Sequence, residues 1–343
     1  MTTKKRKVTS LDVAQRAGVS QSAVSRVFTP GASFSSRMAE KVLRAAEDLS
    51  YRPNVLARSL ITGESRIIGV VVAYFENQFY PEALELLTNA LQSHGFHVLI
   101  FMANNLGDSE QVMQDILDYQ IDGIILASVS ISSQLASRCQ SAGIPVVLFN
   151  RDQDDQSLPA VTSNNYAGGR KVAELFIAAK HRRIAYIAGW EGASTQRDRE
   201  QGFVDRLFES GITLFARAVG NFDREQAQHA TRQIFAGEQK PDAVFVANDH
   251  MAFGVLDVLR HEMNLDIPEQ VSVVGYDDVP LAAWQTFDLT SVRQSAHQMV
   301  DKTVELLLTP MQAGVNAQKV LIDGPLILRG SAKIPRGWDN ERV

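Results

Sequence analysis

From Ile67 onward the chain alternates short, almost wholly apolar runs with longer amphipathic segments. Such an alternation is typical of buried parallel strands that are covered by helices. The first runs are IIGVVVAYF, HVLIFMA, GIILAS and PVVLFN, and a second series begins near Pro159 with PAVTSN, RIAYIAG, LFARAVG, DAVFVAN and SVVGYDD. The pattern predicts an α/β body of two similar doubly wound halves. Ligands of such sheets bind outside the strand C-termini, so a cleft between the halves is the expected small-molecule site.

The size and composition of the chain narrow the class of protein. At 343 residues it is too long for one ordinary core, so more than one domain is expected. The longest apolar run, from Ile67 to Phe75, has nine residues and cannot span a bilayer. The single cysteine, Cys139, excludes an internal disulfide and a cysteine-based metal cluster. Because no apolar signal segment follows the N-terminal basic residues, we expect a cytoplasmic protein with no membrane partner.

Charge is distributed unevenly along the chain. Residues 1–62 carry eleven Lys and Arg against four acidic residues, a net charge of +7, and the whole chain carries −5, which leaves −12 for the remainder. A basic head on an acidic body indicates that only the head meets a polyanion. A solvated basic tail would account for KKRK at residues 4–7, but not for the seven further basic residues on patterned helices.

The head has the pattern of three short helices around a small core. Thr9 or Ser10 can cap a helix over 11–17, Gly18 can end it, and Ser20 can cap a second helix over 21–28. A third helix is expected over 36–49, with an apolar stripe that faces the first two. Two helices joined by a tight turn and packed on a third are the helix-turn-helix plan.

In that plan the N-terminal half of the second helix enters the major groove of DNA. The outward residues there are Gln21, Ser22, Ser25 and Arg26. Glutamine can bond to an adenine edge, arginine to a guanine edge, and serine to either. Thr9, Ser10 and Ser20 are counted with them as DNA-binding candidates. The alternative is an ordinary helical hairpin with a polar outer face, because helix-turn-helix patterns by themselves often mislead.

The segment YRPNVLARSL, residues 51–60, has room for about two helical turns after Pro53. A helix of that length is marginal in water and forms only against a partner. Together, VTSLDVAQRAGVSQSAVSRVF and RPNVLARSL closely resemble the lactose/galactose repressor family of bacterial transcription regulators. The resemblance implies that the second segment is a hinge helix that orders on operator DNA. Leu60 would wedge into the minor groove, and Asn54 and Ala57 also match the hinge pattern.

The body contains no motif typical of an enzyme. It has no GxGxxG or GxxxxGK[ST] for a nucleotide, no GxSxG and no HExxH. His94 and His97 flank Gly95 at an expected helix end, which does not suit a metal pair. We therefore expect no cofactor, no metal and no catalytic residues.

The body resembles the sensor module of the same family, which is similar to periplasmic sugar-binding proteins. The landmarks are NYAGGRKVAE, RDREQGF, VFVANDHMAFG, VSVVGYDD and LTSVRQSAHQM. By this resemblance Arg199 grips sugar hydroxyls or a carboxylate, and Asp277, Asn248 and more loosely Asn150 are cleft acceptors. The remaining effector candidates by resemblance are Phe79 and Phe222, which would stack on the ligand, and Gln294, which would line the cleft.

Structural alternatives exist for several of these residues. Asp249 and Asp278 suit helix or turn caps, and Asp277 and Arg199 could pair with each other. The two phenylalanines could be half-buried core. Arg151, beside Asn150, could contact an anionic group or pair with Asp152 or Asp154; the sequence does not decide.

These observations predict a helix-turn-helix domain at 1–52, a hinge helix and linker at 53–65, and an effector-binding and dimerisation domain at 66–343. The last is expected to contain one subdomain at about 66–164 and 294–323 and another at about 165–293 and 324–343. The expected function is an allosteric, homodimeric transcription regulator, most often a repressor, that binds a pseudo-palindromic operator on double-stranded DNA and a small sugar-like effector. The alternatives are a purine-type co-repressor in place of the sugar, a pure small-molecule binding protein, and an enzyme on the same fold.

Overall fold

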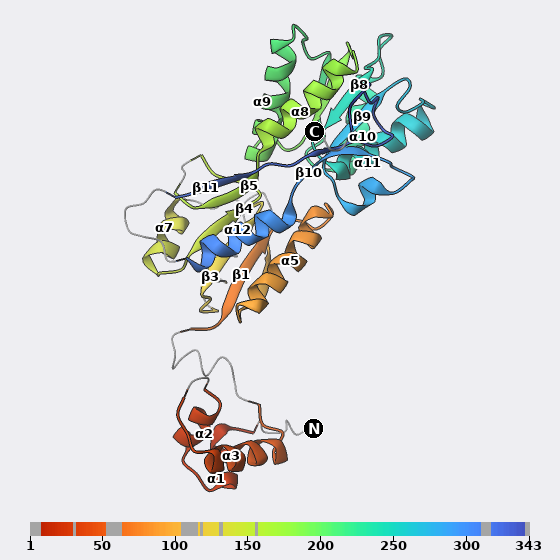
Figure 1. Ribbon diagram of the computed structural model, residues 1–343. Helices are drawn as coiled ribbons and strands as arrows, with labels where there is room; N and C mark the ends of the chain where they lie inside the picture. The colour runs from red at the N-terminus through yellow and green to blue at the C-terminus, as the bar shows by residue number, and fades with distance from the viewer. Residues whose placement is uncertain are drawn as a thin grey trace, which may run out of the picture. The chain divides into compact units, whose positions relative to one another are not determined.

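The structure is a computed structural model that describes residues 8–29, 32–52, 64–103, 116, 119–129, 133–154, 157–309 and 317–339 (Figure 1). The chain divides into two compact units, Met1–Ser65 and Arg66–Val343. Within the described residues, no helix is long and apolar enough to cross a bilayer.

Among its described residues, the first unit has three helices, α1 (Ser10–Ala17), α2 (Gln21–Val27) and α3 (Ser36–Asp48). Thr9 caps α1 through a capping box, because its hydroxyl accepts from the Asp12 amide while the Asp12 carboxylate accepts from the Thr9 amide at 2.8 Å. Gly18 ends α1 at φ +67°, and the Ser20 hydroxyl accepts from the amide of Ala23 at the start of α2. The predicted head is confirmed, with helix ends within one residue of those expected.

A small apolar core holds these helices together. Its buried members are Val13, Ala14, Val24, Val42, Ala45 and Ala46, and partly buried residues such as Phe28 and Tyr51 pack around them. Phe34, in the loop before α3, is 41% exposed and is not part of this core.

The second unit contains two six-stranded sheets within the described residues. The first sheet has the order β11-β5-β4-β3-β1-β2 and the second has β12-β10-β9-β8-β6-β7. All neighbours are parallel except β12, which runs antiparallel to β10. The strands are β1 (Ile67–Val72), β2 (His97–Met102), β3 (Gly123–Ala127), β4 (Val146–Phe149), β5 (Ala160–Ser163), β6 (Ile184–Ala188), β7 (Ala216–Val219), β8 (Ala243–Val246), β9 (Ser272–Asp277), β10 (Thr290–Arg293), β11 (Lys319–Ile322) and β12 (Leu326–Ile327).

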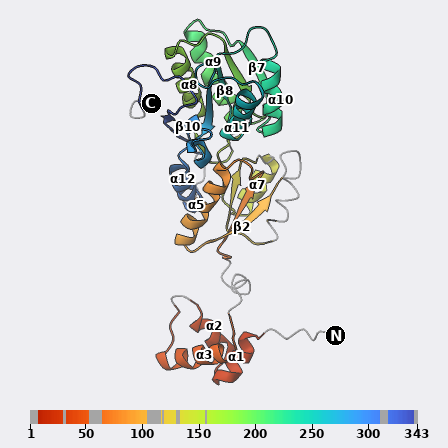
Figure 2. The ribbon, with the colours of Figure 1, turned by 90° about the vertical axis from the view of Figure 1, so that its right-hand side faces the viewer.

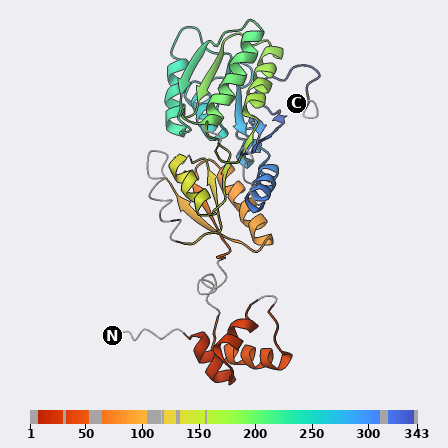
Figure 3. The ribbon, with the colours of Figure 1, turned by 90° about the vertical axis from the view of Figure 1, so that its left-hand side faces the viewer.

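Helices cover both faces of each sheet. The first lobe, which is the first sheet with its helices, has α5 and α12 side by side on one face and α7 on the other (Figure 1). In the second lobe, α8 and α9 lie on one face of the sheet and α10 and α11 on the other (Figures 2 and 3). The helices are α5 (Phe79–Ser93), α7 (Ser133–Ser141), α8 (Asn165–Ala178), α9 (Ser194–Glu209), α10 (Arg224–Ile234), α11 (Asp249–Asp257) and α12 (Ala296–Leu308).

The chain passes between the two lobes three times, after β5, after β10 and after β11. The run PAVTSN was placed at the head of the second series, but its strand β5 pairs with β4 and β11 in the first sheet. The first lobe is thereby completed by α12 and β11, which come from the last fifth of the chain.

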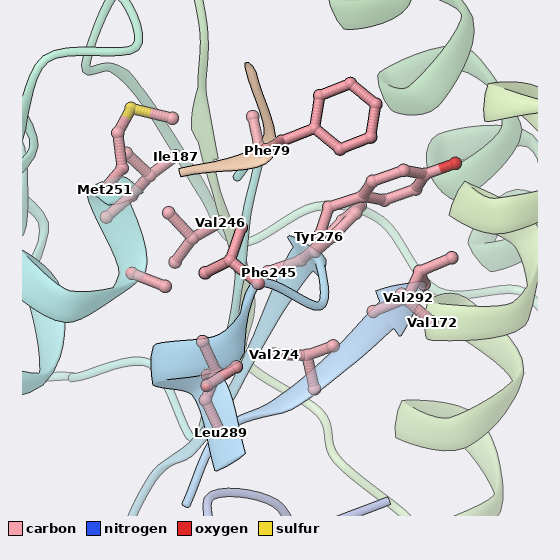
Figure 4. Packing of buried hydrophobic residues seen from close by; sticks show 14 of the residues in the cluster. Phe79, Val172, Ile187, Phe245, Val246, Met251, Val274, Tyr276, Leu289 and Val292 are labelled. Carbon is pink, nitrogen blue, oxygen red and sulfur yellow. The ribbon is translucent and has the colours of Figure 1, made fainter. Parts of the chain in front are cut away.

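One continuous apolar core includes residues of both lobes. In the second lobe it contains Phe245, Val274, Val292 and Leu289, and Phe79 of α5 belongs to the same cluster (Figure 4). Phe79 is 2% exposed and stacks on Phe149 at 6.1 Å between ring centroids. This burial places Phe79 in the core.

Candidate functional site

The first candidate surface is the outer face of α2. Gln21, Ser22, Ser25 and Arg26 are all exposed, whereas Ala23 and Val24 between them are buried. The helix therefore presents a continuous face of hydrogen-bonding groups, as the helix-turn-helix prediction requires.

Local hydrogen bonds hold part of this face in place. Gln21 Nε2 donates to Ser10 Oγ at 2.9 Å, and Arg26 Nε donates to the Ser22 carbonyl at 3.4 Å. The hydroxyls of Ser20 and Ser22 are 2.9 Å apart. Thr9 and Ser20 thus act as helix caps here. The hinge candidates Asn54, Ala57 and Leu60 lie outside the described residues.

The second candidate site is a cavity between the two lobes, at the C-terminal ends of both sets of parallel strands. Its volume is about 10 Å³, far below the roughly 300–1,000 Å³ typical of ligand pockets, so the lining side chains nearly fill it. Its lining comprises Tyr74, Asn77, Tyr80, Asn150, Arg151, Thr195, Arg199, Phe222, Asn248, Asp277 and Gln294. A wider surface hollow near Pro268 and Lys333 contains none of the predicted effector residues.

Polar contacts join the two lobes around this cavity. Asn77, in the loop after β1, donates through Nδ2 to Asp277 at 2.7 Å. The Asp152 amide donates to Ser194 Oγ at 3.1 Å, and Arg197 pairs with Asp154 at 2.7 Å. The lobes are therefore closed over the cavity.

Asp277 is the central acceptor of the site. Besides the bond from Asn77, it accepts a bond of 2.6 Å from Gln294 Nε2, and the Gln294 oxygen in turn accepts from Ser163 at 2.7 Å. Asp277 has φ +115°, a conformation that is costly for any residue except glycine and is typical of functional sites. Burial raises the pKa of its carboxyl to about 6, although Arg199 and the bonds from Asn77 and Gln294 act in the opposite direction.

The two neighbouring carboxylates have structural roles. Asp249 is fully buried, accepts from the Val279 amide and the Ser291 hydroxyl, and so fixes the loop after β9 to the start of α11. Burial, followed by the negative charge of Asp277, raises the pKa of Asp249 well above its usual range. Asp278 pairs with Arg293 and Arg329, each at 2.7 Å. Both contacts agree with the structural interpretation of these two residues.

Arg199 is positioned by α9 and is 2% exposed. Its Nη2 donates to Asn165 Oδ1 at 2.7 Å, its Nη1 donates to the Ala247 carbonyl, and its guanidinium lies 3.4 Å from the centroid of the Tyr276 ring. The predicted alternative, a pair between Arg199 and Asp277, does not occur among the ion pairs of the described residues. Arg199 retains N–H groups that none of these bonds uses.

Backbone conformation also marks the cavity. Asn150 has φ +67° and Phe222 has φ +61°. A Cβ at Gly189 would meet the Phe222 ring at 2.2 Å, so glycine at the end of β6 is what lets the ring lie there. Strained residues that cluster at strand ends are expected where a site orients its side chains.

Six of the seven predicted effector residues line this one cavity: Asn150, Arg199, Phe222, Asn248, Asp277 and Gln294. Phe79 does not, because it packs in the core. No sequence pattern pointed to Tyr74, Asn77, Tyr80 or Thr195, and the role of Arg151 was open. Tyr74 lies near the end of the predicted strand run 67–75 and Asn77 two residues beyond it, so the rule that ligands bind at strand C-termini could have found them.

The described residues contain no cluster of three or more His, Cys, Asp or Glu side chains that could hold a metal ion. A helix-turn-helix head joined to a two-lobed, ligand-binding sensor defines a class of DNA-binding regulators that are controlled by small molecules.

Comparison with known proteins supports this class. Residues 9–54 match the bacterial regulatory proteins of the lacI family, and residues 173–332 match the periplasmic binding protein-like domain. The chain is 28% identical over 334 residues to the probable HTH-type transcriptional repressor ExuR of Bacillus subtilis (strain 168), covering 95% of this chain and 98% of the relative. It is 30% identical over 302 residues to the HTH-type transcriptional repressor PurR of Erwinia tasmaniensis, covering 87% and 88%.

A solved structure agrees with the fold over nearly the whole chain. The Lac repressor dimer bound to operator and the anti-inducer ONPF superposes with a TM-score of 0.85 at 26% identity, covering 95% of this chain and 99% of that one. The chain belongs to the lacI family of bacterial regulatory proteins. It is a transcription regulator with a DNA-binding head and a ligand-binding sensor, and the prediction that it is not an enzyme is confirmed by this membership.

Proposed function

We propose that this regulator represses transcription as a homodimer and that a small sugar-like effector, bound between the lobes, controls its affinity for a pseudo-palindromic operator. The observation that carries the proposal is the cavity at the strand ends, which takes polar side chains from both lobes. A ligand there contacts both lobes at once and so alters how they close.

The head supplies the operator contacts. Gln21, Ser22, Ser25 and Arg26 would read base edges in the major groove, while Thr9, Ser10 and Ser20 hold the helix starts and contact the DNA beside them. Two heads related by a two-fold axis need two half-sites related in the same way. The Lac repressor structure similar to this chain is a dimer on its operator, which supports this arrangement. A regulator that works on bacterial DNA acts in the cytoplasm.

The hinge, residues 53–65, would link the two events. Asn54, Ala57 and Leu60 lie outside the described residues, and their roles rest on the family pattern. A helix of about two turns is marginal without a partner. A small change in the separation of the two hinge segments therefore decides whether the hinge helices form on DNA. Each ligand then acts through its different affinities for the DNA-bound and free states.

The residues of the cavity favour a polyhydroxy effector. Arg199 and Asn248 offer N–H groups and Asn150 offers an unpartnered oxygen, while the oxygens of Asp277 and Gln294 would accept from sugar hydroxyls in place of their side-chain partners. A purine-type co-repressor is the second candidate, because Tyr74, Tyr80 and Phe222 add aromatic rings to the lining and could hold a flat ring.

The test has two stages. Selection from random duplex DNA with the full chain should enrich a pseudo-palindrome, and sugars and purines are then screened for release or tightening of that operator. Arg199→Ala and Asp277→Ala should each lose the response to the active compound. A full response in both variants would place the effector site elsewhere. Leu60→Asp tests the hinge separately, since it should lose operator binding but still dimerise.

A further inference from the structure

The cavity between the lobes contains two buried arginines that are not paired with acids. Arg151 is 5% exposed and Arg199 is 2% exposed. Within the described parts of the chain, neither guanidinium has a carboxylate at ion-pair distance, although most surface arginines of the second lobe do, as Arg170 does with Glu209. Burying a cation without an anion is unfavourable, so a site with two such cations is suited to receive negative charge.

Arg151 is held in place, but part of its hydrogen-bonding capacity is unused. Its Nη1 donates to the Ser128 carbonyl at 2.9 Å, whereas its Nε is buried and has no hydrogen-bond partner among the described residues. Its guanidinium lies 5.4 Å from the Trp190 ring centroid and 6.0 Å from that of Phe222. Both rings come from the second lobe, so Arg151 of the first lobe projects into the interface between them. Aromatic faces attract the cation but leave the N–H groups at its edge free to donate.

Asn248 offers a second unused donor, from the opposite lobe. Its Oδ1 accepts from the Met251 amide at 3.0 Å and so caps α11. A backbone N–H can only donate, which fixes the orientation of the side-chain amide and leaves Nδ2 as the free end. That Nδ2 is buried without a partner in the described structure.

The acceptors of the cavity, by contrast, are largely occupied. Asp277 is the one carboxylate among the lining residues, and each of its oxygens accepts a bond, from Asn77 and from Gln294. Asn150 Oδ1 is the unpartnered acceptor of the lining, enough for one ligand hydroxyl. With two arginines and one aspartate, the lining has a net positive charge and an excess of donors over free acceptors.

We propose that the effector carries an anionic group, a carboxylate or a phosphate, that binds Arg151 from the first lobe and Asn248 from the second, with Arg199 contributing to the positive field. An anion that accepts from both lobes ties them together, which couples its binding to closure. This inference rests on the proposed function and narrows its ligand class to acidic sugar derivatives.

The test compares matched ligands by calorimetric titration of the full-length protein. The pairs are D-galacturonate with D-galactose, D-glucuronate with D-glucose, and D-glucose 6-phosphate with D-glucose, and hypoxanthine represents the purines. At least one acid should bind ten times or more tighter than its neutral partner. Preference for the uronates or for the phosphate distinguishes the two anionic groups.

Variants then assign that preference to a residue. In Arg151→Gln the acid and its neutral partner should bind within about threefold of each other, whereas Arg151→Lys, which keeps the charge, should retain part of the preference. Arg232→Gln is the matched control, because Arg232 pairs with Glu262 on the surface of the second lobe. Thermal unfolding of each variant confirms that it folds.

The remaining outcomes separate this inference from the function on which it rests. Tight binding of a neutral sugar or of hypoxanthine alone, or an acid preference unchanged in Arg151→Gln, overturns the anionic effector. If that binding is lost in Asp277→Ala, the cleft is still the effector site. A protein that binds no member of the panel overturns the anionic sugar effector, and operator binding that responds to no metabolite overturns the proposed function as well.

Discussion

Asn77 and Asp277 are 200 positions apart in the chain and are joined by a hydrogen bond of 2.7 Å across the cleft. Asn77 also accepts from the Phe79 amide through Oδ1, so its Nδ2 can point only toward the second lobe. One side chain thus ties the start of α5 to the end of β9. This hydrogen bond stabilises the closed arrangement of the two lobes.

Asn77→Asp should remove the hydrogen bond between residues 77 and 277. The new carboxylate keeps the bond from the Phe79 amide but meets the carboxylate of Asp277, and bonds to charged groups contribute about 1.5–3 kcal/mol. We expect the Asp152 amide, which donates across the cleft to Ser194, to exchange its hydrogen about tenfold faster or more in the ligand-free protein. The control is Asn264→Asp, at an exposed position of the second lobe. Equal exchange in Asn77→Asp and wild type would show that the bond does not hold the lobes together.

The pH dependence of stability should report on Asp277. Because its folded pKa, about 6, lies above the usual 3.8, the folded state binds this proton more tightly than the unfolded state does. Binding of that proton adds to the free energy of unfolding. The contribution is fully present below pH 3.8 and is lost as the pH rises through 6, and it amounts to up to about 3 kcal/mol.

Asp277→Asn removes this titration. Its amide can be accommodated, because the Gln294 side chain can turn and still bond to the Ser163 hydroxyl. In urea unfolding, the variant should be more stable than wild type at pH 8, with an advantage that shrinks at pH 5. A difference that does not vary with pH would mean that this carboxyl has an ordinary pKa in the folded protein.

The crossing of α8 and α9 depends on two glycines. A Cβ at Gly169 would lie 2.1 Å from the Arg199 carbonyl oxygen, and a Cβ at Gly202 would lie 2.0 Å from the Tyr166 carbonyl oxygen. Neither oxygen can withdraw unless the helices separate, so Gly169→Ala or Gly202→Ala should lower the free energy of unfolding by about 3 kcal/mol. Gly237→Ala is the control, since its Cβ would meet nothing nearer than 3.5 Å. Denaturant unfolding measures all three, and alanine at either crossing without loss would mean that the helices pack less closely.

Arg26→Ala should weaken operator binding by about 1–3 kcal/mol and relax the base preference at one position of each half-site. Arg44→Ala is a suitable comparison, because Arg44 is exposed on α3 and pairs with Glu40. Its loss should leave the ranking of operator sequences unchanged. Affinities for the selected operator and its single-base variants measure both. An unaltered ranking in Arg26→Ala would remove that residue from the base-reading set.

The sequence was most informative where structure is decided locally. The ends of α1 and α2 follow from Thr9, Gly18 and Ser20, whose capping chemistry acts within a few residues. Strands β1 to β9, of four to six residues each, coincide with the apolar runs of the sequence. Strands β10, β11 and β12 were not predicted, because the segments TSVR and KVLI mix polar with apolar residues and β12 has two residues.

The residues of the candidate site also fall into two groups, those that the sequence revealed and those that it did not. Arg199, Asn248 and Asp277 were found through family motifs. Asn77 and Thr195 were not. Asn77 lies two residues past a predicted strand, where the strand-end rule applies, whereas the place of Thr195 in the cavity follows from the approach of the opposite lobe, which no local pattern reveals. Phe79 shows the converse: an aromatic residue at a helix start resembles a stacking platform until the packing of Phe149 against it is known.

The route of the chain through the two lobes has a consequence for genetics and engineering. Because β11 lies at the edge of the first sheet and β12 at the edge of the second, a nonsense codon anywhere before Lys319 strips one strand from each lobe at once. Neither lobe can be expressed as one uninterrupted fragment. Late truncations should therefore behave as null alleles, and a separately folding first lobe would need a deletion of residues 164–295, with Ser163 joined to Ala296 through a designed linker.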